Sequence, residues 1–132
     1  MEEFELKATA QTPYIHFNAQ SGEMIVQGRA ISQPDEDFWA PVLKWFYAYA
    51  VAPSETTNVI FNLEYFNISS SKQILFLLHK MNDLMEEGHD VIVEWRYSED
   101  DLEMKESGFD FSCVVNVPFE FKSVPVEIIT PL

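Results

Sequence analysis

Short stretches in which apolar and polar residues alternate are spread over the whole chain. This alternation is typical of strands with one buried face. It predicts strands over residues 5–9, 14–18, 24–31, 58–64, 91–97 and 117–122. Residues 20–23, which include Gly22, supply a turn between the second and third strands. In the last strand we expect Phe119 and Phe121 to face the core.

Three longer stretches repeat apolar residues at intervals of three and four, the spacing of one helical face. The expected helices begin near the acidic residues 35–37, span residues 69–87, and run from a cap at residues 98–101 to about residue 110. Pro41 is compatible with the first turn of the first helix and would kink it elsewhere. Gly88 is expected to end the second helix.

The strands at 58–64 and 91–97 each carry polar residues on one face, whereas strands covered by helices on both faces are apolar throughout. We therefore expect an α/β protein in which a single-layer mixed sheet carries its helices mainly on one face. Alternating strands and helices after an initial hairpin predict right-handed crossovers and partly parallel strands. The expected core includes Phe61, Leu78, Met81 and Trp95, whereas Asn62, Glu64, Glu94 and Arg96 are expected to lie free of a second helical layer.

With 132 residues, of which 47% are hydrophobic, the chain fits a single domain over residues 1–132 with one core. No apolar run approaches the roughly 20 residues of a membrane span, and the acidic start differs from a secretory signal. A cytoplasmic location is therefore expected. The lone Cys113 cannot form an internal disulfide, and its apolar neighbours predict a buried side chain.

The formal net charge of −14 argues against binding to nucleic acid or an anionic membrane and favours basic partner surfaces. The sequence lacks phosphate loops, nucleophile elbows, dinucleotide fingerprints and metal-ligand spacing. We therefore expect a non-enzymatic protein without a cofactor or metal. Two alternatives stay open: a small-molecule or lipid-binding domain that uses the less covered sheet face or a pocket lined by Trp95 and Phe119, and an acid–base enzyme that uses Asp100, Asp101 or Glu103.

The junction between the fourth strand and the second helix brings several hydroxyl groups together. Asn67 there precedes Ser69, Ser70 and Ser71. Asn and Ser are favoured caps because their side-chain oxygens accept hydrogen bonds from the free N–H groups of the first helical turn. Capping alone needs fewer hydroxyls than this. A phosphate on one of these serines would meet the positive end of the helix dipole.

The junction and two later segments together resemble the SiaC family of bacterial regulatory phosphoproteins. The resemblance rests on residues 65–72, residues 93–97 and the acidic run 99–101 with Met104, and it extends over nearly the whole chain. It implies a fold similar to that of anti-sigma-factor antagonists of the STAS type. It also implies a partner-switching protein that is the substrate of a Ser/Thr kinase and phosphatase. The unphosphorylated form would bind and activate a diguanylate cyclase in cyclic-di-GMP signalling.

The chain departs from the family's Asn-Thr-Ser-Ser pattern at Ile68, which has no hydroxyl where the phosphate-accepting threonine falls. The acceptor has moved to Ser69 or Ser70, or it has been lost and only the binding surface is kept. The STAS-like fold favours Ser69, and we expect the hydroxyls of Ser69 and Ser70 to be exposed. We assign the switch to Ser69, Ser70 and Ser71, and partner binding to Tyr65, Phe66, Asn67, Ile68 and Lys72. Lys72 either pairs with the phosphate or a partner carboxylate, or is simply solvated.

Overall fold

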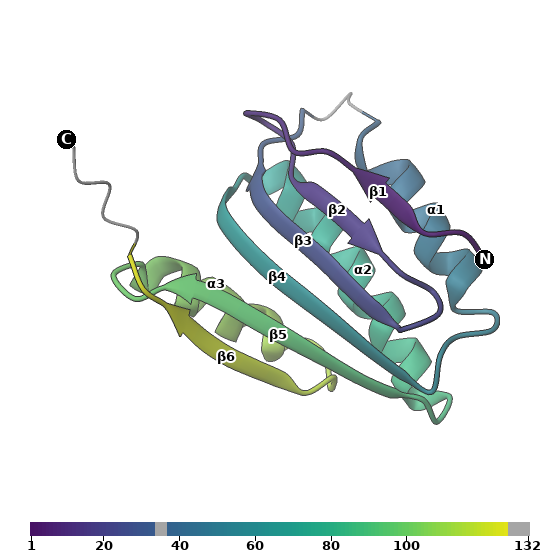
Figure 1. Ribbon diagram of the computed structural model, residues 1–132. Helices are drawn as coiled ribbons and strands as arrows, with labels where there is room; N and C mark the ends of the chain where they lie inside the picture. Colours follow the sequence, from purple (N-terminus) through teal and green to yellow (C-terminus); the bar gives the residue numbers. More distant parts are fainter. Residues whose placement is uncertain (34–36, 127–132) are drawn as a thin grey trace.

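A six-stranded sheet with three helices on one face forms the part of the chain that the computed structural model describes, residues 1–33 and 37–126 (Figure 1). The strands lie side by side in chain order: β1 (Phe4–Leu6), β2 (Tyr14–Phe17), β3 (Glu23–Ala30), β4 (Thr56–Phe66), β5 (Asp90–Ser98) and β6 (Phe119–Val124). The helices are α1 (Trp39–Tyr49), α2 (Ile68–Glu86) and α3 (Leu102–Ser112).

The sheet is mixed. β1, β2 and β3 pair antiparallel, whereas β3 to β6 run parallel to one another. Parallel neighbours require a crossover, and each of the three helices supplies one. Figure 1 shows all three helices behind the same face of the sheet. The predicted fold class, a mixed α/β sheet with helices on one face, is confirmed.

The core lies between the helices and the covered face of the sheet. All four residues predicted to be buried there, Phe61, Leu78, Met81 and Trp95, have no exposed surface. No second helical layer covers the opposite face in the described residues. Glu94 is nevertheless only 6% exposed on that face, because Arg96 and Lys122 both pair with its carboxylate. Its burial therefore comes from ion pairing within the sheet.

The ends of α2 follow the capping signals in the sequence. Asn67 is the N-cap, and Gly88 follows the last turn with a φ of 101°, a conformation that glycine adopts without strain. The N–H of His89 donates to the carbonyl of Leu84, which completes a Schellman motif. Asp101 caps α3 in the same manner as Asn67 caps α2.

The start of α1 differs from the prediction. The helix begins at Trp39, and its N-cap, Phe38, has no side-chain hydrogen bond. Pro41 lies in the first turn, as expected, where its missing N–H removes no helical hydrogen bond. Of the acids predicted at this helix start, Asp37 precedes the helix, and residues 35 and 36 lie outside the described residues.

The predicted burial of Cys113 is wrong, because the side chain is exposed just after the last turn of α3. Phe121 faces the helical side of the sheet, as predicted, because its register partner on β5 is the buried Trp95. It is nevertheless 36% exposed, because β6 has only one neighbouring strand in the described residues and α3 covers it only in part. None of the helices within residues 1–33 and 37–126 is long and apolar enough to cross a membrane.

Candidate functional site

The junction between β4 and α2 is a single residue, Asn67, in extended conformation. Its side-chain oxygen accepts a hydrogen bond from the N–H of Ser70 at 3.0 Å, and its amide nitrogen donates to the carbonyl of Ser32 at 2.7 Å. Its backbone N–H donates to the carbonyl of Ala30 at 3.1 Å. Asn67 therefore caps α2 and also ties the junction to the chain that follows β3.

Ser70 lies inside the protein, and the prediction of an exposed hydroxyl at this position is wrong. The side chain has no exposed surface. Its oxygen lies 2.8 Å from the hydroxyl of Ser32 and accepts a hydrogen bond from the N–H of Ser32 at 3.2 Å. Ser70, the third residue of α2, points toward the loop after β3. Its hydroxyl therefore links α2 to that loop by hydrogen bonds inside the protein.

The other two serines have different surroundings. The hydroxyl of Ser71 donates to the carbonyl of Ile68 at 2.6 Å. Ser69 is half-buried, and its hydroxyl makes no hydrogen bond to any residue that the structure describes. Ser69 lines a hollow of about 190 Å³ between the starts of α1 and α2, together with Ser32, Gln33, Asp37, Trp39, Ala40, Leu43 and Gln73.

The residues assigned to partner binding divide into a surface group and an interior group. Ile68 is 78% exposed, Tyr65 is 48% exposed, and Lys72 is also exposed. Phe66 and Asn67 are half-buried; Phe66 packs on Trp95 and Phe111, with ring centroids 6.3 and 5.9 Å apart. Phe66 and Asn67 therefore hold the junction in place, and the accessible residues are Tyr65, Ile68 and Lys72.

Sequence reasoning missed Ser32 and Arg29, which complete the site. The guanidinium of Arg29 lies over the ring of Tyr65, 5.7 Å from its centroid. Arg29 lies near the end of β3, and Ser32 lies in the loop after it. The signal was available in principle, because the carboxyl ends of adjacent parallel strands meet at one edge of a sheet. Arg29 and Lys72 thus add positive charge to the junction of an otherwise acidic chain.

The expected pocket beside Trp95 is not open, which corrects that interpretation. The Trp95 ring is fully buried, and its N–H donates to the carbonyl of Met104 at 2.9 Å. Gly108 of α3 lies directly against the ring, so close that an added Cβ would be 2.4 Å from two ring atoms. The ring of Phe119 also stacks on the Trp95 ring, with centroids 6.3 Å apart. The space around Trp95 is filled by protein.

The acids considered for acid–base chemistry have structural contacts. Asp101 accepts a hydrogen bond from the N–H of Met104 at 3.1 Å and so caps α3. Asp100 accepts one from the hydroxyl of Ser98 at 2.8 Å, and Glu103 is exposed in the first turn of α3. Within the described ranges, no three His, Cys, Asp or Glu residues are grouped as a metal site requires.

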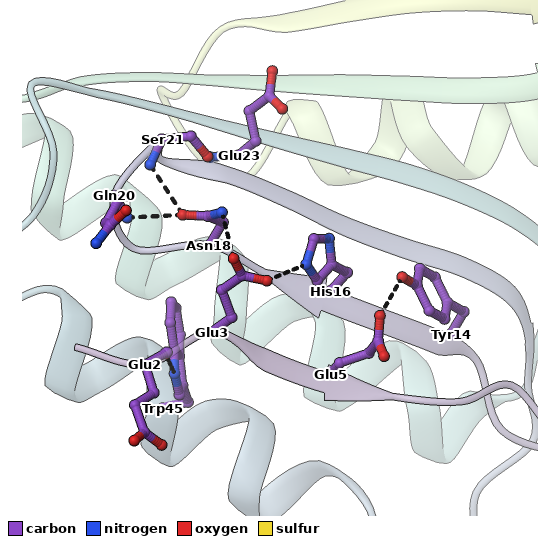
Figure 2. Close-up of polar contacts among 10 residues, drawn as sticks. All are labelled: Glu2, Glu3, Glu5, Tyr14, His16, Asn18, Gln20, Ser21, Glu23 and Trp45. Atoms are coloured by element: carbon purple, nitrogen blue, oxygen red, sulfur yellow. Dashed lines mark hydrogen bonds and ion pairs between the residues drawn. The ribbon is translucent and has the colours of Figure 1, made fainter.

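Polar contacts cover part of the sheet face that has no helices. Figure 2 shows Glu3 and Glu5 reaching from the N-terminal segment to β2 and the turn that follows it. The Tyr14 hydroxyl donates to Glu5 at 2.8 Å, which raises the pKa of Tyr14, and Glu3 contacts His16 at 2.9 Å and Asn18 at 3.2 Å. These contacts hold the short strand β1 on its neighbour.

At the other end of this face, Glu94 lies among cations. Burial raises the pKa of Glu94, but the hydrogen bonds from Lys122 and Arg96 outweigh burial and hold the pKa below its ordinary value. The contact between the Lys122 ammonium and the Glu94 carboxylate, 2.7 Å long, also raises the pKa of Lys122. Glu94 is therefore a charged link between β5 and β6.

Comparison with known proteins agrees with the family resemblance of the sequence. The model of a family described as "SiaC family regulatory phosphoprotein" matches residues 6–124. An uncharacterized protein of Pseudomonas aeruginosa strain UCBPP-PA14 is 21% identical over 123 residues, which are 93% of this chain and 98% of that protein.

Solved structures show the same fold. The crystal structure of apo-SiaC from Pseudomonas aeruginosa matches with a TM-score of 0.85 at 22% identity, covering 93% of this chain and 100% of that one. A crystal structure of the diguanylate cyclase SiaD in complex with its activator SiaC, from the same organism, matches with a TM-score of 0.82 at 22% identity, covering 92% and 99% of the two chains.

Proposed function

Because this chain belongs to the SiaC family of regulatory phosphoproteins, we propose that it is a non-catalytic switch protein that binds and activates a diguanylate cyclase. A solved relative with the same fold is the activator in a complex with such a cyclase, which supports this assignment. The unphosphorylated form would bind the cyclase. A cognate Ser/Thr kinase and phosphatase in the cytoplasm would add and remove the phosphate.

The phosphate acceptor that we propose is Ser69, and one observation carries this choice. Of the three serines at the junction, Ser69 combines partial exposure with a hydroxyl that has no hydrogen-bond partner in the described residues. A kinase must reach the hydroxyl and remove its proton. At Ser70 it would first have to break the buried pair with Ser32, and at Ser71 the bond to Ile68.

A phosphate on Ser69 would act mainly through its charge. It adds about −1.5 to −2 charges within the first turn of α2, where the helix dipole favours an anion, so we expect the fold to persist. Asp37 lines the same hollow and would repel the phosphate toward solvent and Lys72. The new charge would offset Lys72 and Arg29 and would keep a partner from close contact with Ile68.

The test uses the purified cognate kinase and intact-mass measurement of phosphate incorporation. Ser69→Ala should abolish incorporation, whereas the matched variant Ser71→Ala should be phosphorylated like the wild type. Replacing Ile68 with Thr in the Ser69→Ala background should restore an acceptor if the family register holds. Full phosphorylation of Ser69→Ala would rule out Ser69, and a wild-type chain that takes up no phosphate would favour a relative that has kept only the binding surface.

The second part of the test measures binding to the cognate cyclase by calorimetry. Ser69→Asp should weaken binding by about 1 to 3 kcal/mol, because the added charge lies where Ile68 and Lys72 meet the partner. Ser69→Ala should bind like the wild type. An Asp variant with unchanged affinity would contradict the electrostatic mechanism, even if Ser69 proved to be the acceptor.

A second candidate function, small-molecule binding, is supported by a hollow of about 500 Å³ at the carboxyl ends of the parallel strands. It is lined by Gln27, Gly28, Asn62, Leu63, Glu64, Ser98, Asp100, Asp101, Val124 and Pro125. Ligands of open α/β sheets bind at this edge. The acidic lining fits a polar cation better than a lipid. Mass spectrometry of the purified native protein would show a bound compound if this function is correct.

A further inference from the structure

An apolar groove runs between α3 and the edge strand β6, away from the β4–α2 junction. It has a volume of about 340 Å³ and is lined by Leu102, Lys105, Glu106, Phe109 and Phe121. Its three apolar side chains are 64%, 59% and 36% exposed, in the order Leu102, Phe109 and Phe121. Grouped apolar side chains of this size on a surface are typical of an interaction site.

The fold itself does not need these side chains. α3 packs on the sheet through Met104, Gly108 and Phe111, which lie against or beside Trp95. Leu102 and Phe109 are seven residues apart and so share a second face of the same helix, directed away from that contact. A helix that only covered the sheet would carry polar residues there.

The groove lies beside an unpaired strand edge. Within the described residues, β6 pairs only with β5, so its outer edge presents free backbone N–H and C=O groups. An extended peptide that pairs with such an edge directs every second side chain to the same face of the sheet. On the helical face, those side chains would reach Phe121 and Phe109.

Charges around the groove indicate the composition of its occupant. The exposed acids Glu103, Glu106 and Asp110 lie beside it on α3, whereas the exposed Glu120 of β6 points to the opposite face of the sheet, like its register partner Glu94. Lys105, which lines the groove, lies over the ring of Tyr97 at 5.7 Å. Lys122 lies on the opposite face of the sheet, where it pairs with Glu94 at 2.7 Å. A second copy of this chain would bring the same acids face to face, which disfavours self-association through this surface.

We propose that this groove binds an extended segment of the partner cyclase in which apolar residues alternate with Lys or Arg, added beside β6 as a further strand of the sheet. The inference rests on the proposed function, because it takes the partner to be the cyclase. It assigns a second contact surface, distinct from the phosphorylation switch at Ser69. The apolar residues fill the groove, and the alternating basic residues point to the opposite face of the sheet, beside Glu120.

The test is calorimetric titration of the full chain with the cognate cyclase. Phe109→Ser and Leu102→Ser should each weaken binding about tenfold or more, because each removes an apolar contact that the partner desolvates. The matched control is Phe76→Ser, since Phe76 is 53% exposed on α2, outside the groove. Glu120→Lys should weaken binding by about fivefold to tenfold, because it places a cation beside the basic residues of the added strand, whereas Glu87→Lys, beyond the end of α2, should not.

Hydrogen exchange measured by mass spectrometry tests the strand pairing, and residues 119–124 should exchange more slowly in the complex. If the wild type fails to bind the cyclase, the proposed function fails. If the wild type binds and Phe109→Ser binds equally well, only the groove inference is overturned. Unchanged exchange in β6, a dimer that Phe109→Ser dissociates, or about tenfold tighter cyclase binding after removal of residues 127–132 would each overturn the proposed occupant.

Discussion

Replacing Gly108 with Ala tests how closely α3 approaches the sheet. The added Cβ would lie 2.4 Å from Cδ1 and Nε1 of Trp95 and 2.6 Å from Cγ. Real Cβ atoms do not come this close to other heavy atoms, so the helix or the ring must move. The ring has little freedom, because it is fully buried, donates to the carbonyl of Met104 and contacts Phe61 and Phe111.

Two opposing effects set the size of the change. Alanine in place of glycine inside a helix stabilises it by about 1 kcal/mol. Overpacking of a well-filled core costs about 1 to 3 kcal/mol, and a rigid ring places Gly108→Ala at the upper end. The net expectation is a loss of about 2 kcal/mol in the free energy of unfolding, which lowers the melting temperature by about 5 to 8 °C in a domain of this size.

The assay is chemical and thermal unfolding followed by circular dichroism. Ser107→Ala, at the neighbouring position of α3, should change stability by no more than about 0.5 kcal/mol. In a Trp95→Leu background, the smaller side chain leaves room, and Gly108→Ala should no longer destabilise the protein. A Gly108→Ala variant that is more stable than the wild type would show that the helix propensity of alanine outweighs the contact and would refute the close packing of α3 on Trp95.

Three further predictions follow from the core, the junction and the open sheet face. Leu78→Ala should cost about 2 to 5 kcal/mol, because the side chain is fully buried; a urea-unfolding loss below about 1 kcal/mol would contradict its place in the core. Asn67→Ala should cost about 1 to 2 kcal/mol by removing the cap of α2, and Asn67→Ser should recover part of it in the same assay; equal stability of both variants would contradict the capping role. The lowered pKa of Glu94 stabilises the fold above the ordinary value of 4.5, and this stability is lost as the pH falls through the lower folded-state pKa. In Glu94→Gln, the free energy of unfolding should therefore depend less on pH in that window. An identical pH profile of stability would argue against the ion pairs.

Local sequence alone determined most of the secondary structure. The alternation in β4 and β5 and the apolar stripe of α2 reflect which side of each element meets the core, and that information is carried by neighbouring residues. The caps Asn67 and Gly88 also act within one turn of the helix. The polar faces of β4 and β5 were sufficient to predict that helices cover one face of the sheet. The family resemblance, carried by short motifs, is confirmed by the family match over residues 6–124.

Tertiary structure decided what the local pattern could not, because long-range contacts set which polar groups are free. Ser69 and Ser70 are equivalent in the sequence pattern. Ser32 lies 38 residues away from Ser70 in the chain, yet it is hydrogen-bonded to the hydroxyl of Ser70 and not to that of Ser69. Phe121 has the alternation of a core residue, but no strand pairs with the outer edge of β6 in the described residues to help cover it. The candidate acceptor and the groove beside β6 thus both depend on which elements pack together, and a linear sequence specifies that packing only through the whole fold.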